Sequence, residues 1–373
     1  MASEAIRTGP VGWPERTLLP LVEAWAHKWL RQPDGPNAGE PWTFTEEQRR
    51  ITAWWYAYDE HGDWLIRRGT LRRVKGWGKD PYGAVLCANE LLGPCRIVRV
   101  GDTLKVRPNA AAWVQVAAVS RDQTRTTMRV FPALFSKEAV AKWKIDLNKE
   151  VIYAKSGQVV IEAITSSPRS AEGPRATFVL RNEIQNWLST NDGHAMAEVI
   201  DGNLTKSRDG AARALSLCNA HVPGDDSVGE REWDAYQQIA QGRSRATGVM
   251  YDSLEAPADT KLDDEASLRH GLELARGDSV WLDIDRHVGE IWDPRTTPSE
   301  ARRKYLNQII AAEDAWVAPH QVDALLEPAP RPLQKSDMVA LGFDGSKSDD
   351  NTGLSAVRID DGASFQVASW DPS

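Results

Sequence analysis

The stretch RRVKGWGKDPYGA, residues 72–84, is the most informative part of the sequence. It matches the phosphate-binding pattern G-x-x-x-x-G-K-[ST] at Gly78 and Lys79, and it departs from that pattern at Arg73 and Asp80. In the pattern, backbone N–H groups surround the phosphates, the lysine reaches the outer phosphates and the hydroxyl binds Mg²⁺. A carboxylate at Asp80 supplies oxygen to Mg²⁺ as a hydroxyl does, and Arg73 offsets the added negative charge. The alternative for the stretch taken alone is an exposed basic turn.

The sequences on either side predict a strand before this stretch and a helix after it. Residues 64–74, WLIRRGTLRRV, carry β-branched and apolar residues in short runs, which predicts paired strands. Residues 81–92, PYGAVLCANELL, have apolar residues at helical intervals, and Pro81 falls in the first turn, where its missing N–H costs little. Strand, glycine-rich turn and helix is the context of a phosphate loop, so the sequence favours nucleotide binding.

Four further short apolar segments predict strands of the same sheet. Each is mostly unbroken by charge, as a strand buried on both faces requires. The sequence therefore predicts an α/β fold of the P-loop NTPase type, with a largely parallel sheet and helices on both faces. The four segments are residues 113–120, 159–165, 176–180 and 214–220.

The chain of 373 residues is long for one domain, and its composition changes along its length. A helix is predicted at about 46–59, with Thr45 as its N-cap. Three antiparallel strands are predicted in the last segment, which is too short to form a domain. We expect an N-terminal extension at 1–40, an ATPase core at 41–225, a helical and charged region at 226–326 that contributes to the same sheet, a proline-rich linker at 327–337 and a further domain that begins at 338–373.

Composition narrows the class of protein. There is no run of eighteen or more apolar residues, so no membrane span is predicted, and the N-terminus carries no basic and apolar leader. Cys87, Cys95 and Cys218 lack metal-type spacing and are expected to be reduced core residues. The net charge of −8 argues against a surface covered in DNA-binding charge, but it allows a local basic groove. The aromatic residues of 51–59 are expected to pack in the core rather than stack on bases.

A second acidic motif follows one of the predicted strands. ATFVLRNEIQNW, residues 176–187, places Asn182 and Glu183 where nucleotide-hydrolysing enzymes usually carry Asp-Glu. Glu183 is the predicted catalytic base, and a solvated residue at a helix start is the alternative. Asn182 departs from the usual aspartate, and the carboxylate at Asp80 suggests that the acidic metal ligand has moved to the phosphate loop.

Taken in order, four motifs resemble the large terminase subunit of tailed bacteriophages, the motor that packages DNA into the capsid. The resemblance runs from about residue 40 to the end of the sequence. In that family a P-loop ATPase precedes an RNase H-like nuclease, and a basic residue in place of the first glycine is typical. The resemblance implies a lid or linker subdomain at 226–326 and the start of the nuclease at 338–373. The motifs are RRVKGWGKD, ATFVLRNEIQNW, SLCNAHVPGDDSVGE and LGFDGSKSDDNTG.

The resemblance also implies roles for individual residues in the ATPase. Gln48 is expected to contact adenine, with an ordinary surface glutamine as the alternative. Glu183 activates water, and Asn219 senses the γ-phosphate, unless it is a structural asparagine. Arg169 and Arg175 are candidates for an arginine finger that reaches a neighbouring subunit, or are plain surface charges. The residues expected to hold the triphosphate and the metal are Arg73, Gly76, Gly78, Lys79 and Asp80, with Asn182 as a weaker metal ligand.

For the nuclease, the resemblance places a metal-binding carboxylate at Asp344, at the end of the predicted strand MVALGF. Two-metal cleavage needs several converging carboxylates, and the partner acids expected on later strands fall beyond residue 373. We therefore expect the nuclease to be incomplete and inactive in this chain.

The predicted function is an ATP-hydrolysing motor that uses Mg²⁺ and ATP to translocate double-stranded DNA into the capsid. The partners implied are the portal protein, the small terminase subunit and further copies in a homo-oligomeric ring, in the cytoplasm of the infected bacterial host and transiently on the procapsid portal. Basic clusters at 67–75, 120–129 and 299–306 are candidates for DNA contact. The alternatives are a nucleic-acid-stimulated P-loop ATPase or helicase that is not a packaging motor, and a non-catalytic DNA-binding or capsid-assembly adaptor.

Overall fold

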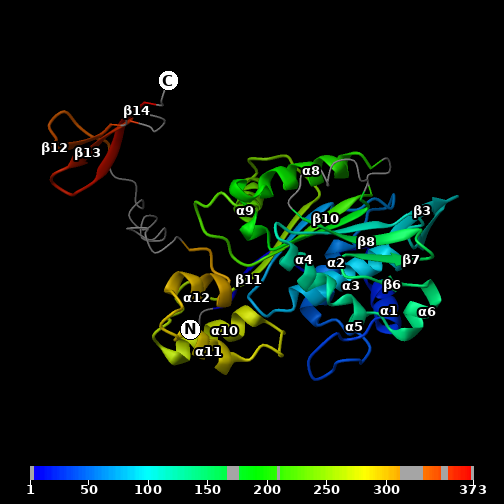
Figure 1. Cartoon of the computed structure of the whole chain (residues 1–373). Helices are drawn as coiled ribbons and strands as arrows, with labels where there is room; N and C mark the ends of the chain where they lie inside the picture. The colour runs from blue at the N-terminus through cyan, green and yellow to red at the C-terminus, as the bar shows by residue number, and fades with distance from the viewer. Residues whose placement is uncertain (1–3, 166–175, 208–210, 311–330, 346–351, 371–373) are drawn as a thin grey trace. The chain divides into compact units, whose positions relative to one another are not determined.

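The computed structural model describes residues 4–165, 176–207, 211–310, 331–345 and 352–370 (Figure 1). The chain divides into two compact units, Met1–Asp314 and Ala315–Ser373. Each unit has its own sheet.

The first unit is built on a nine-stranded sheet. Its six central strands run parallel, and the strands at the two edges pair antiparallel. The expected α/β fold with a largely parallel sheet is confirmed. Across the sheet, the strands are β1 (Ile6–Thr8), β11 (Val249–Glu255), β2 (Arg68–Arg72), β10 (Arg213–Cys218), β9 (Phe178–Asn182), β5 (Trp113–Ala117), β8 (Val159–Ile164), β7 (Val151–Ala154) and β6 (Asp146–Leu147).

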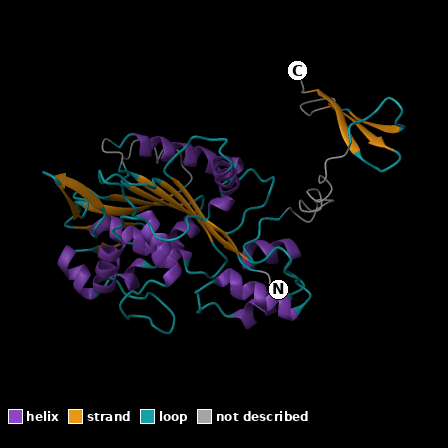
Figure 2. Ribbon diagram, turned by 180° about the vertical axis from the view of Figure 1, so that it is seen from behind, coloured by secondary structure: helices purple, strands orange, loops and turns teal. Residues whose placement is uncertain are grey.

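Helices cover both faces of this sheet, as the two opposite views show (Figures 1 and 2). One face carries α1 (Leu19–Trp29), α2 (Glu46–Trp55), α3 (Lys79–Leu92), α4 (Arg121–Met128), α5 (Phe131–Leu134) and α6 (Lys137–Trp143). The other face carries α8 (Gly193–Thr205) and α9 (Val228–Ala240). Three helices follow β11, namely α10 (Glu265–Arg276), α11 (Ile284–Ile291) and α12 (Pro298–Tyr305). The remaining elements are a hairpin of β3 (Arg96–Val100) and β4 (Thr103–Arg107) and two 3₁₀ turns, η1 (Ile184–Asn186) and η2 (Ser189–Asn191).

The core has a hydrophobic cluster on each side of the sheet, because successive side chains of a strand point to opposite faces. On β9, Phe178 and Leu180 belong to the larger cluster, and Val179 between them belongs to the smaller one. Trp55, from the aromatic segment, is fully buried in the larger cluster, in agreement with the expected packing role. The three cysteines are buried and free.

Two local predictions around the phosphate loop need correction. The expected helix at 46–59 ends at Trp55, because Ala57 and Tyr58 instead form bridges to Thr17 and Trp64. Within residues 64–74 one strand forms, at Arg68–Arg72 (β2), rather than two paired strands. The partners of β2 are β10 and β11, which lie far away in the sequence, so β2 does not pair with a second strand from residues 64–74.

The second unit contains a three-stranded antiparallel sheet in the order β12 (Val339–Asp344), β13 (Thr352–Arg358) and β14 (Ser364–Trp370). Three antiparallel strands were expected there. Residues 327–330 of the predicted linker at 327–337 lie outside the described residues, and its boundaries stay a prediction. None of the helices in the described ranges is long and apolar enough to cross a membrane.

Candidate functional site

The loop between β2 and α3 contains two glycines with positive φ angles. Gly76 and Gly78 have φ values of +86° and +92°, in the left-handed region where other residues are strained. Gly78 directly precedes α3, so the N–H groups of the first helical turn, from Lys79 onward, lie at the end of the loop. Such a helix start, with its free N–H groups and positive dipole end, suits an anion.

This loop borders a cavity of about 610 Å³. Lys79 and Glu183, which are 104 positions apart in the sequence (183 − 79), line the same cavity. The predicted residues Gly76, Gly78, Asp80 and Asn219 line it as well. The other lining residues are Asp34, Lys75, Pro81, Gln185, Asn186, Ala220, Trp281, Arg303 and Lys304.

Lys79 is held over the loop by backbone oxygens. Its Nζ donates to the carbonyls of Arg73 at 3.3 Å and Val74 at 3.2 Å, and the residue is 7% exposed. Burial lowers the pKa of Lys79, against an opposing effect of the Glu183 carboxylate. An ammonium group with only carbonyl partners has donor capacity left for phosphate oxygens.

Asp80 and Asn182 are in direct contact. Asn182 Nδ2 donates to Asp80 Oδ1 at 2.9 Å, and Thr127 Oγ1, on α4, donates to the same oxygen at 2.6 Å. Asn182 Nδ2 also donates to Thr127 Oγ1 at 3.1 Å. Asn182 is 2% exposed, and its Oδ1 has no hydrogen-bond partner among the described residues. A buried oxygen in this state is costly unless a ligand completes it.

These groups fit a magnesium ion that is bound mainly through phosphate. The described ranges contain no cluster of three or more His, Cys, Asp or Glu side chains that could hold a metal ion. Mg²⁺ is usually held by one or two protein oxygens together with water and substrate phosphates. Asp80 lines the cavity and supplies such an oxygen. Asn182 is not among the lining residues, but it contacts Asp80, and its Oδ1 has no hydrogen-bond partner among the described residues.

Glu183 lies at the cavity in an unusual backbone conformation. Its φ of +55° is left-handed, which costs of order 1 kcal/mol for a residue other than glycine. Its carboxylate accepts from Gln185 Nε2, and Gln185 Oε1 accepts from the backbone N–H of Asn219 at 3.3 Å. Asn219 Nδ2 then donates to the carbonyl of Arg73 at 2.6 Å. A hydrogen-bonded chain therefore joins the carboxylate of Glu183 to the phosphate loop.

Comparison with known proteins shows the family to which the chain belongs. No family model matches the sequence. The Gene 13 protein of Mycobacterium phage L5 is 45% identical over an alignment of 408 residues, covering 96% of this chain and 68% of the relative. The Gene 13 protein of Mycobacterium phage D29 is 44% identical over 359 residues, covering 88% of this chain and 60% of that relative. The chain belongs to the family of the mycobacteriophage Gene 13 proteins.

Among solved structures, the HK97 bacteriophage large terminase is similar to this chain with a TM-score of 0.55 and 16% sequence identity. The match covers 96% of this chain and 69% of the HK97 chain. At this identity the likeness concerns the fold. The resemblance to phage large terminases is confirmed at that level for this member of the Gene 13 family.

In this chain, the side chain of Arg73 does not lie at the phosphate-loop cavity, where it was predicted. Its guanidinium is fully buried, pairs with Asp252 on β11 and with Glu47 at 3.0 Å, and lies over Trp77. A buried guanidinium needs such carboxylate partners, and they turn it away from the cavity. The side chain of Arg73 does not line the cavity, so its position does not support the expected contact with phosphates or with the charge of Asp80. Only its carbonyl takes part, as the acceptor for Lys79 and Asn219.

Gln48 also lies outside the residues that line the cavity. It is 3% exposed, and its side-chain oxygen accepts from the backbone N–H of Thr45 at 3.2 Å, which completes the capping box of α2. The expected adenine contact is therefore not supported by its position. Arg169 and Arg175 fall outside the described residues. Asp344 ends β12 in the second unit.

Sequence reasoning missed several residues at the cavity. Arg303 lines the cavity, and Thr127 reaches the cavity only through its hydrogen bond to Asp80. Both fall in segments that were assigned to DNA contact because of their basic charge. Gln185 follows Glu183 by two positions, and Trp281 belongs to a segment without any motif. Of these, only Gln185 had a sequence signal, its place within the acidic motif.

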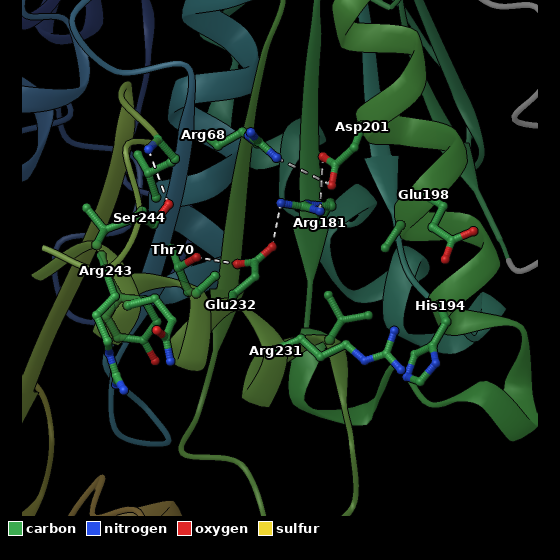
Figure 3. A pocket seen from close by; sticks show the side chains of 18 residues that line it. Arg68, Thr70, Arg181, His194, Glu198, Asp201, Arg231, Glu232, Arg243 and Ser244 are labelled. Carbon is green, nitrogen blue, oxygen red and sulfur yellow. Dashed lines mark hydrogen bonds and ion pairs between the residues drawn. The ribbon is translucent and has the colours of Figure 1, made fainter. Parts of the chain in front are cut away.

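A second cavity, of about 540 Å³, lies between α8, α9 and the sheet (Figure 3). Its floor includes Arg181 on β9, which pairs with Glu232 at 2.5 Å and Asp201 at 3.5 Å. Glu232, on α9, also accepts from Thr70 and from Ser216 at 3.2 Å. None of the predicted nucleotide-binding residues lines this cavity. The carboxylates around Arg181 disfavour a bound phosphate there.

Proposed function

We propose that this chain is an ATP-hydrolysing motor of viral DNA packaging. The observation that carries the proposal is that Lys79, Asp80 and Glu183 line one cavity, at a glycine-rich turn between a parallel strand and a helix. The family and the fold agree with this function.

The loop would hold the phosphates of ATP through N–H groups at the start of α3 and through the ammonium of Lys79. Asp80 and Asn182 would hold Mg²⁺, and Thr127 fixes the orientation of Asp80. When bound, Mg²⁺ neutralises the charge that develops on the phosphate oxygens. Glu183 orients the attacking water and accepts its proton. Asn219 and Gln185 hold Glu183 in register with the loop.

Several parts of the proposal reach beyond this cavity. The chain is proposed to translocate double-stranded DNA as one subunit of a ring on the portal protein, together with the small terminase subunit, in the infected bacterial cell. Arg169 or Arg175 would act on a neighbouring subunit's nucleotide. Residues 226–326 would form the lid of the ATPase, after a core at 41–225. Residues 338–373 would begin an RNase H-like nuclease, with Asp344 as a metal ligand.

The test compares the chain with its Glu183→Gln variant in a Mg²⁺-dependent ATP hydrolysis assay, with and without double-stranded DNA. We expect DNA-stimulated hydrolysis by the chain, and about a 100- to 1,000-fold lower rate in the variant with ATP binding retained. Glu198→Gln serves as a matched control, because Glu198 is exposed at the other cavity.

Two outcomes would contradict the motor. No ATP binding and no hydrolysis by the unaltered chain would favour the non-catalytic adaptor. Hydrolysis that single-stranded nucleic acid stimulates more than duplex DNA would favour a helicase-like ATPase.

A further inference from the structure

The segment that follows β11 is hydrogen-bonded to the phosphate loop at several points. Ser279 Oγ donates to the carbonyl of Trp77 at 3.4 Å. The backbone N–H of Lys75 donates to the carbonyl of Lys304 at 2.7 Å, which joins the loop to the end of α12. Trp281 Nε1 donates to the carbonyl of Gly76 at 3.0 Å. Segments more than 200 residues away in the sequence therefore form one wall of the cavity.

This wall adds Arg303 and Lys304 to the positive charge of Lys75 and Lys79, and these four groups differ in their partners. Lys304 pairs with Glu300 on the same helix. Lys75 is exposed, with its Nζ 5.9 Å from the ring centroid of Tyr305. Lys79 donates to backbone carbonyls.

Arg303 is in a different state. It is half-buried, and its Nε donates to the carbonyl of Ser299 at 3.3 Å. No ion pair joins Arg303 to a carboxylate within the part of the chain that the structure describes. Both terminal nitrogens of its guanidinium are thus available to an anion in the cavity. A planar guanidinium matches phosphate oxygens with two parallel hydrogen bonds, which an ammonium cannot do.

We propose that Arg303 binds the terminal phosphate of the nucleoside triphosphate held by the loop, and so reads whether that phosphate is present. This inference rests on the proposed ATP site and adds a residue to it from the opposite wall. Only the triphosphate has a γ-phosphate, so only the triphosphate gains the contact with Arg303. Because α12 carries Arg303 and is tied to the loop at Lys304, loss of the phosphate removes one of the contacts between the helical wall and the loop.

The proposal changes the interpretation of the basic segment 299–306. Its charge suggested DNA contact, but Arg303 lies in the cavity with Lys79 and Glu183. A DNA-contacting arginine contributes to affinity for any duplex in a salt-dependent manner. A phosphate-reading arginine instead distinguishes ATP from ADP, which gives the experiment its readout.

The test measures the affinities of the 373-residue chain for ATP and ADP by calorimetry in the presence of Mg²⁺, under conditions without turnover. We expect the chain to bind ATP more tightly than ADP. Arg303→Ala should weaken ATP binding about 10- to 100-fold and leave ADP binding within about threefold, the range for hydrogen bonds to a charged group. Arg303→Lys should recover part of the preference for ATP, because the charge returns without the planar fork.

The matched control is Arg286→Ala on α11, an exposed arginine in the same set of helices that does not line the cavity. It should leave both affinities unchanged. Circular dichroism of each variant establishes that its fold is retained. Arg303→Gln, which keeps a polar side chain of similar reach, replaces Arg303→Ala if that variant does not fold.

Equal ATP preference in the chain and in Arg303→Ala would overturn the inference and leave the proposed ATP site intact. Equal affinities of the unaltered chain for ATP and ADP would overturn it as well. Absence of ATP binding by the unaltered chain is a separate outcome, which counts against the proposed function itself. A parallel loss of ATP and ADP binding in the variant would assign Arg303 a role in the general shape of the site and would overturn the reading of the terminal phosphate.

Discussion

The phosphate-loop cavity and the cavity between α8, α9 and the sheet differ in how their charged residues are paired. Between α8, α9 and the sheet, the buried guanidinium of Arg181 is matched by Glu232 and Asp201, and Glu232 also binds hydroxyls of two other strands (Figure 3). At the phosphate loop, Lys79 has only backbone carbonyls as partners, and Asn182 Oδ1 has no partner among the described residues.

The difference is one of charge pairing. At one cavity a buried arginine is paired with carboxylates, whereas at the other the ammonium of Lys79 has backbone carbonyls as its hydrogen-bond partners. Paired buried charges join strands and helices, and removing one partner leaves the other uncompensated. An unpartnered buried polar atom is not by itself a sign of a ligand site, because Arg181 Nε at the other cavity also lacks a hydrogen-bond partner among the described residues. Cavity size does not make this distinction, because the two volumes are similar, at about 540 and 610 Å³.

The largest expected effect is at Lys79. Replacing Lys79 by Ala should lower Mg²⁺-dependent ATP hydrolysis by about 1,000-fold, because the outer phosphates lose their charged donor. The rate is measured by phosphate release at saturating ATP. Arg231→Ala, which removes an exposed ion pair with Asp226 at the other cavity, is the control and should stay within about twofold. A similar loss of hydrolysis rate in both variants would contradict the assignment of the ATP site to the phosphate-loop cavity.

Because Asp80 and Asn182 are in contact, we expect that the carboxylate ligand of the metal can be moved from position 80 to position 182. Asp80→Asn should lower hydrolysis by about 100-fold and weaken the dependence on Mg²⁺ concentration, because the carboxylate ligand is lost. Asp80→Ser combined with Asn182→Asp places the carboxylate on β9 and should recover at least about tenfold of that loss. The measurement is hydrolysis across a Mg²⁺ titration. A double variant no better than the single one would contradict a shared metal site.

At the other cavity the expected effect is on stability. Glu232→Ala should lower the free energy of unfolding by about 3 kcal/mol, because Arg181, Thr70 and Ser216 lose their shared acceptor. Glu232 is 19% exposed, which places the cost at the lower end of the range for a buried pair. Chemical denaturation measures the change, and Glu198→Ala at the exposed rim should shift it by less than about 0.5 kcal/mol. An unchanged unfolding midpoint would show that the pairing does not hold α9 to the sheet.

The smallest effect concerns pH. Burial, with the nearby charges of Arg72 and Arg303, lowers the pKa of His221 from 6.5 to about 4. Between these values the unfolded chain takes up a proton that the folded chain does not, so this residue's contribution lowers stability as the pH falls from about 6.5 to about 4. His221→Gln should remove about 2 kcal/mol of that dependence, as judged from denaturation at pH 7 and pH 4.5. An unchanged slope in the variant would mean that other groups carry it.

Much of the fold and part of the candidate site follow from local sequence. The apolar runs predicted the central strands β5, β8, β9 and β10, because a strand buried on both faces must be apolar almost throughout. Thr45 marked the start of α2 because its side chain caps the helix locally. The glycines of the loop and the acidic motif at Asn182 were visible because each follows directly after a strand.

Tertiary structure alone decided which polar residues face the cavity. Arg73 belongs to the phosphate-loop motif, but its guanidinium is buried in an ion pair with Asp252 on β11. Arg303 sits in a basic segment without a motif, and α12 carries it into the cavity. The physical reason is that burial and periodicity are properties of neighbouring residues, whereas the partner of a charged side chain lies on elements that only folding brings together.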